Sequence, residues 1–173
     1  MIMYYTLCVT LPIERMKTLI SILDKAEKEA KKKWMKDSEV LELRLIEDML
    51  PFSKQIQIVS DNAKGTAARL SGKEILQIED TESTIDELKN RLQKTISFLE
   101  TFNEKDFKGA ETSEARFPYF PDQHMIGEGY LLTYALPNFF FHMTTAYSIL
   151  RAHGFDLGKK DYLPHVALIK DEV

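Results

Sequence analysis

The stretch that decides the fold is Leu136–Tyr147, which reads LPNFFFHMTTAY. At about 100° per residue, the polar side chains of Asn138, His142 and Thr145 fall on one line of a helix. A broad apolar face lies beside that line and consists of Leu136, Phe139, Phe140, Met143, Tyr147 and Leu150. We expect a helix this apolar to be buried on more than one side. Its polar line then needs partners, because an unpaired buried polar group costs about 1–3 kcal/mol.

The sequence leaves three roles open for His142: a hydrogen-bonded core residue, an acid, base or ligand contact in a pocket, or a metal ligand. The next histidine on the same line is His153, which is roughly 16 Å away along a helix and too far to share one ion. His124 and His165 lie outside the expected helices. We therefore expect no metal site and no cofactor.

Two carboxylates join the candidate site. Asp61 lies on the less apolar side of the helix expected at about 51–72, near Gly65 and Ala68, which are small enough to permit close approach of another helix or chain. We expect Asp48 to cap free amides at the start of that helix rather than to act in catalysis. No residue receives a catalytic role. The candidate pocket residues are Asn138, His142, Thr145, Asp61 and Asp48.

Hydrophobic periodicity predicts four long helices, at about 12–33, 51–72, 84–102 and 129–153. A shorter helix follows the first, with Ser38 as its N-cap. Pro12 is expected in the first turn of its helix, whereas Pro137 lies inside the last helix and predicts a kink. The capping-box pattern Thr84-x-x-Glu87 opens the third helix.

Helical periodicity disappears between about 103 and 129, which predicts a long crossover with one short extended piece at about 115–119. A crossover of this kind packs over the helices and could cover a pocket between them. Four helices with one long crossover describe an all-α protein, a four-helix bundle. The expected organisation is a single domain over residues 1–163 and a C-terminal tail over residues 164–173.

Composition excludes several classes of function. A net charge of −4 gives no field that attracts polyanions, so we expect no nucleic-acid partner.

The single cysteine, Cys8, excludes an internal disulfide and fits a reducing compartment. No run reaches the ~18 apolar residues of a membrane span, and the N-terminal residues lack a signal-peptide pattern. We expect a cytoplasmic protein without a membrane partner. Phosphate-loop, nucleophile-elbow and His-Glu-x-x-His motifs are absent.

Short runs spread over nearly the whole chain, up to about Leu163, resemble one known family. These runs are Asp48-Met49-Leu50-Pro51, Ser60-Asp61-Asn62-Ala63-Lys64-Gly65, Glu79-Asp80-Thr81-Glu82, Ala135-Leu136-Pro137-Asn138-Phe139, Phe141-His142, Thr144-Thr145-Ala146-Tyr147, Leu150-Arg151, Gly158-Lys159 and Asp161-Tyr162. The family is catalogued as domain of unknown function nineteen ninety-three and is similar to the DinB and YfiT-like superfamily. That resemblance implies a four-helix bundle, frequently dimeric, with a metal site between helices.

The superfamily's metal pattern is three histidines, one on the second helix and a His-x-x-x-His pair on the last. This sequence departs from it, because only His142 could stand for one of the three. Some relatives use such sites to transfer small thiols or to hydrolyse small amides, and the ligands for that chemistry are missing here. A transcriptional regulator is disfavoured by the acidic balance and by the absence of a basic recognition helix.

Two hypotheses remain. In the first, the protein binds a small molecule in a pocket between helices near His142, without the three-histidine metal site. In the second, it is a non-catalytic homodimer in which the same polar groups satisfy a core network. The expected dimer face is Phe139, Phe140, Tyr147 and Leu150.

Overall fold

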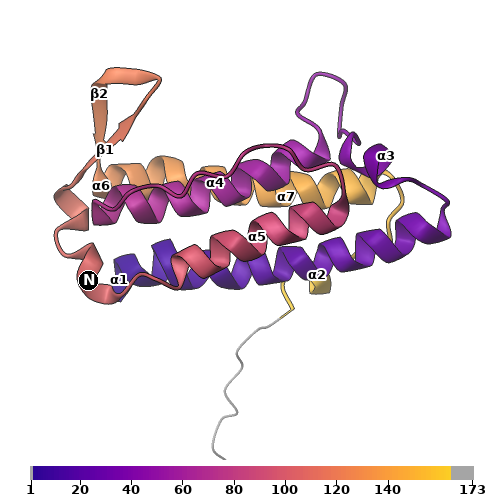
Figure 1. The fold of residues 1–173 in the computed structure, drawn as a ribbon, viewed down its shortest axis with the longest axis horizontal. Coiled ribbons are helices and arrows are strands. Elements are labelled where there is room, and N and C mark those ends of the chain that lie inside the picture. Colours follow the sequence, from indigo (N-terminus) through magenta and orange to yellow (C-terminus); the bar gives the residue numbers. More distant parts are fainter. Residues whose placement is uncertain (1, 165–173) are drawn as a thin grey trace, which may run out of the picture.

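The computed structural model describes residues 2–164 and is mainly helical (Figure 1). The long helices are α2 (Leu11–Lys32), α4 (Phe52–Ser71), α5 (Ile85–Leu99) and α7 (Leu136–Ala152). Helix α4 packs against both α5 and α7, and α2 packs against the same two helices on the other side of the core (Figure 1). Within the described residues, no helix is long and apolar enough to cross a bilayer.

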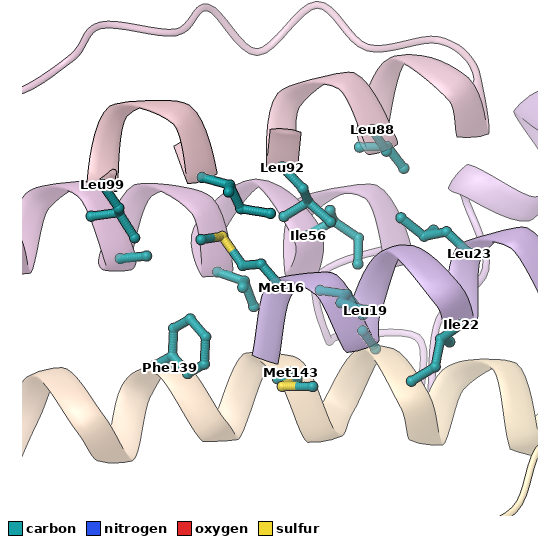
Figure 2. Close-up of a cluster of buried hydrophobic side chains, with 14 of the residues drawn as sticks. Met16, Leu19, Ile22, Leu23, Ile56, Leu88, Leu92, Leu99, Phe139 and Met143 are labelled. Carbon is teal, nitrogen blue, oxygen red and sulfur yellow. The ribbon is translucent and has the colours of Figure 1, made fainter. Parts of the chain in front are cut away.

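The core between these helices is built from the apolar positions that helical periodicity marks. Figure 2 shows Met16 from α2, Ile56 from α4, Leu92 from α5, and Phe139 and Met143 from α7, all almost completely shielded from solvent. Two of the residues expected to form a dimer face, Phe139 and Leu150, therefore belong to this core. That part of the dimer argument was wrong, because the chain itself already buries these two side chains.

Both prolines predicted to mark the helices lie inside continuous helices. The first helix begins at α1 (Ile2–Tyr5) and passes through a π-helical segment, η1 (Thr6–Thr10), into α2, so Pro12 does not open it. Helix α6 (Gly127–Gly129) likewise passes through π-helical η4 (Tyr130–Ala135) into α7, which contains Pro137. A π-helical turn bonds each amide five residues back, so it accommodates a proline that lacks one donor. The kink expected at Pro137 stays a prediction.

The crossover contains more regular structure than the sequence predicts. It runs through two 3₁₀ turns, η2 (Glu104–Phe107) and η3 (Ala110–Thr112), and then forms an antiparallel hairpin of β1 (Glu114–Phe117) and β2 (Phe120–Ile126). The fold is thus not strictly all-α. The expected extended piece is β1, whereas β2 was missed because it is exposed along nearly its whole length and has no apolar alternation to reveal it.

Helix ends follow local chemistry. The capping box of α5 is confirmed: the hydroxyl of Thr84 accepts a hydrogen bond from the amide of Glu87, and the Glu87 carboxylate accepts one from the Thr84 amide. The short helix α3 (Asp37–Leu41) begins after Lys36, not at Ser38, because the Glu39 carboxylate bonds the Lys36 amide at 2.6 Å. The prediction of Ser38 as N-cap was wrong.

The C-terminal segment packs on the helices as far as it is described. Phe155 and Leu157 are buried, and α8 (Lys159–Tyr162) contacts α2, where Asp161 pairs with Lys25. The ring of Tyr162 meets that of Tyr147 edge to face at 5.7 Å. Apart from Pro164, the expected tail at 164–173 lies outside the described residues.

Candidate functional site

His142 connects α7 to the start of α4. Its Nδ1 lies 2.7 Å from Oε1 of the buried Gln55, whose Nε2 donates to the carbonyl of Leu50 at 2.9 Å. Because an amide oxygen only accepts, Nδ1 of the imidazole carries the proton in this arrangement. Partial burial lowers the pKa of His142, so the ring is neutral at neutral pH. The Nδ1 atom of His142 is therefore satisfied by a hydrogen bond within the protein, as expected for a residue of a core network.

The other residues of the polar line have different surroundings. Thr145 is buried and donates to the carbonyl of Phe141 at 2.7 Å, so its own helix satisfies it. Asn138 is half-buried and borders a cleft that neither His142 nor Thr145 lines. The structure therefore does not bring the three residues together at one site.

Asp48 is exposed and does not cap α4. The first free amide of that helix belongs to Phe52, and it donates to the carbonyl of Leu43 at 2.8 Å. The guanidinium of Arg44 closes the same turn by donating to the carbonyl of Met49 at 2.6 Å. The capping role expected for Asp48 was wrong because backbone contacts across the turn take its place.

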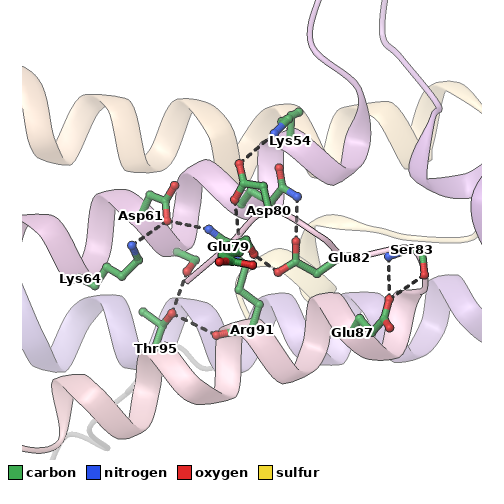
Figure 3. A network of polar contacts seen from close by, with 12 residues as sticks. Lys54, Asp61, Lys64, Glu79, Asp80, Glu82, Ser83, Glu87, Arg91 and Thr95 are labelled. Atoms are coloured by element: carbon green, nitrogen blue, oxygen red, sulfur yellow. Dashed lines mark hydrogen bonds and ion pairs between the residues drawn. The ribbon is translucent and has the colours of Figure 1, made fainter. Parts of the chain in front are cut away.

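Asp61 belongs to a charged network centred on Arg91, whose side chain is only 1% exposed (Figure 3). The guanidinium of Arg91 donates to Asp61 at 2.7 Å and to Asp80 and Glu82 at 2.9 Å each. Lys64 adds a second cation 3.0 Å from Asp61. The network attaches the segment between α4 and α5 to both helices. Asp61 is thus ion-paired, with its side chain 44% exposed.

Arg91 was missed in the sequence, although two signals mark it. It lies at core spacing between Leu88 and Leu92, where a cation requires buried anions. The acidic run at 79–82, just before the helix, supplies them. These acids therefore have a structural role.

A cleft of about 540 Å³ lies between α4, the segment η4–α7 and the hairpin. One face of α4 contributes Ile58, Asp61, Asn62 and Arg69; the facing helix contributes Tyr130, Tyr134 and Asn138; the hairpin contributes Phe117, Tyr119, Phe120, Gln123, His124 and Met125. Of the sequence candidates, the cleft brings together Asp61 and Asn138, and it leaves out His142, Thr145 and Asp48.

Aromatic rings form the inner wall of the cleft. Phe117 meets Tyr130 and Tyr134 edge to face at 5.5 and 5.8 Å between ring centroids. The hydroxyl of Tyr130 is 3.1 Å from that of Thr66, and burial raises the pKa of Tyr130, so it stays protonated. Within residues 2–164, the amides of Asn62 and Asn138 have no side-chain hydrogen bond. These amides are free to bond a molecule in the cleft.

The hairpin is fixed over the cleft at its base. The amide of Gly127 donates to the carbonyl of Ser113 at 2.8 Å, which joins the end of β2 to the start of β1. A Cβ at Gly127 would overlap the carbonyl oxygen of Ala110. Only glycine allows this close approach, so Gly127 sets the position of the hairpin.

The residues around His142 do not fit a transition metal. A 2.7 Å contact between Nδ1 and Gln55 Oε1 is a hydrogen-bond distance, and an ion bound to both atoms at ~2.0–2.2 Å would hold them farther apart. Within the described residues, no group of three His, Cys, Asp or Glu side chains could hold a metal ion.

The fold and sequence match known proteins over almost the whole chain. A crystal structure of a DinB family member protein from Shewanella denitrificans superimposes with a TM-score of 0.93 at 36% identity, covering 98% of this chain and 96% of that one. No curated protein matches. The model of one family, described as Domain of unknown function (DUF1993), matches residues 4–163. The chain therefore belongs to this DinB-like family of unknown function.

Proposed function

We propose that the protein is a DinB-like four-helix bundle that binds a small organic molecule in the cleft between α4, η4–α7 and the hairpin, without the superfamily's three-histidine metal site. The observation that carries the proposal is the cleft's composition: aromatic walls together with two side-chain amides, Asn62 and Asn138, that have no side-chain hydrogen bond within the described residues. Pockets for small molecules have this composition and have volumes of about 300–1,000 Å³. The proposed site lies near Asn138, whereas the sequence predicted a pocket near His142.

A neutral fluorescent probe, N-phenylnaphthylamine, tests this proposal. We expect saturable binding to the wild type, and Tyr134→Ala should weaken it about tenfold because one aromatic wall is lost. Tyr134 is 46% exposed, so its removal should leave the core intact. The matched control is Leu132→Ala, on the same segment and 52% exposed but outside the cleft, which should change binding less than about twofold.

Absence of probe binding to the folded wild type would overturn the proposal. An equal loss of probe affinity in Tyr134→Ala and Leu132→Ala would also overturn it, because the probe would then bind the exposed surface of η4 rather than the cleft.

A second candidate function is the non-catalytic homodimer. Phe141 is 54% exposed and Tyr134 46%, and they are separated by about two helical turns on one face of the helix. This exposed pair replaces Phe139 and Leu150 in the expected interface. Light scattering at tens of micromolar protein should give the mass of a dimer for the wild type and of a monomer for Phe141→Ser. A strictly monomeric wild type would exclude this candidate.

A further inference from the structure

Arg69 is the cation of the cleft, and it makes no ion pair with any carboxylate in residues 2–164. Its Nε donates to the carbonyl of Arg116 at 3.1 Å, and the guanidinium lies over the ring of Phe117 at 4.8 Å. It also lies close enough to lower the pKa of Tyr130, against the larger raising effect of burial. A backbone bond and a ring thus hold the guanidinium in place at the cleft.

Gly65, one turn earlier on α4, makes the position of Arg69 possible. A Cβ at Gly65 would overlap a terminal nitrogen of the Arg69 guanidinium, and all three of its nearest neighbours are atoms of Arg69. The sequence suggested that Gly65 admits another helix or chain. In the structure the space above it holds the side chain of Arg69.

The other charges around the cleft are already compensated. Asp61 is paired with Arg91 and Lys64, which neutralise it. On the hairpin, Glu114 pairs with Arg116 at 2.5 Å, and His124 lies 3.7 Å from the same carboxylate. Arg69 is therefore the charge at this site that no carboxylate in residues 2–164 compensates. A guanidinium held by a ring and a backbone bond favours an anion, because charge-assisted hydrogen bonds are stronger than neutral ones.

We propose that Arg69 binds the anionic head group of the ligand, which makes the ligand class a small organic anion with an aromatic or apolar body. This inference rests on the proposed function. The apolar body lies against Phe117, Tyr130 and Tyr134. The unbonded amides of Asn62 and Asn138 bond a further polar group of the ligand.

Two probes with the same skeleton separate the anion from the apolar body. Anilinonaphthalene sulfonate carries a sulfonate that N-phenylnaphthylamine lacks. We expect the wild type to bind the anionic probe at least about tenfold more tightly than the neutral one. Displacement by phenylacetate and phenyl phosphate, but not by the isosteric neutral phenylacetamide, should show the same preference. The ratio of the two anions then tells a carboxylate from a phosphate head group.

The variants act on Arg69 in two independent ways. Arg69→Gln removes the charge, and Gly65→Ala leaves Arg69 in the chain but displaces its guanidinium. Both variants should lower the affinity for the anionic probe at least about tenfold and change the affinity for the neutral probe less than about twofold. The control, Lys94→Gln, removes an exposed cation of α5 that does not line the cleft and should leave the binding of both probes unaffected. Melting temperatures confirm that each variant is folded.

The outcomes distinguish the two proposals. Equal binding of both probes, with no selective effect in either variant, overturns the anion site and leaves the cleft as a neutral binding site. If Arg69→Gln and Gly65→Ala lose affinity for both probes equally, the anion site is also overturned, because Arg69 would then only shape the cleft. Failure of both probes to bind the wild type overturns the proposed function itself. If Arg69→Gln does not fold, Gly65→Ala decides, since alanine is favoured over glycine inside a helix.

Discussion

Arg91→Leu should lower the free energy of unfolding by about 3–5 kcal/mol. The side chain of Arg91 is 1% exposed, and that of its partner Glu82 is 6% exposed. Removing the guanidinium leaves Glu82 buried without its cation, and Asp61 and Asp80 lose the same partner. Urea unfolding of the purified variant measures the loss directly.

The matched control for Arg91 is Lys54→Met, which removes the exposed cation of the same network. The ion pair of Lys54 with Asp80 has side chains 42% and 39% exposed, so its loss should cost no more than about 1 kcal/mol. If Arg91→Leu cost as little as Lys54→Met, the network would not hold the segment between α4 and α5, and our account of Asp61, Asp80 and Glu82 would be wrong.

Gly127→Ala should destabilise the protein by about 2–3 kcal/mol, because its Cβ would overlap a backbone oxygen, that of Ala110, and backbone cannot move aside as a flexible side chain can. The strain falls on the junction between the hairpin and η4, so the walls of the cleft should separate. We therefore expect the variant to bind N-phenylnaphthylamine at least about tenfold more weakly than the wild type, measured beside thermal unfolding.

Gly129→Ala, two residues along the chain, is the control for Gly127→Ala. A Cβ at Gly129 meets nothing within 4 Å, and its backbone is helical, so alanine there should be neutral or stabilising. Equal stability of the two alanine variants would show that the contact between Gly127 and Ala110 does not position the hairpin.

The helices were predictable wherever the apolar spacing is strict and the caps are local. The end of α4 at Gly72, with its φ of 70°, and the capping box at Thr84 follow from short patterns in the sequence. The helical residues before Pro12 were not predictable, because proline usually opens a helix and nothing local signals a π-helical turn. Strand β2 was missed because its exposed residues carry no periodic signal.

The candidate site was only partly predictable, because a polar line along a helix is not a site. Asn138 and Thr145 are separated by about 10 Å of helix rise, and the cleft ends at Asn138. Thr145 bonds its own helix, and His142 reaches Gln55 on a neighbouring one. Arg69 lies at the cleft because its side chain occupies the space above Gly65 and bonds the carbonyl of Arg116 in the hairpin, which is distant in sequence. Such tertiary contacts leave no periodic signal.

The central claim is that the cleft between α4, η4–α7 and the hairpin binds the ligand, and an NMR titration of the isotope-labelled protein with phenylacetate tests it most directly. The account predicts that the largest shifts fall on cleft residues, namely Asn62, Arg69, Tyr134 and Asn138. Shifts clustered elsewhere, such as around Gln77 and Lys94 beside α5, or the absence of any shift with either phenylacetate or the neutral phenylacetamide, would contradict it.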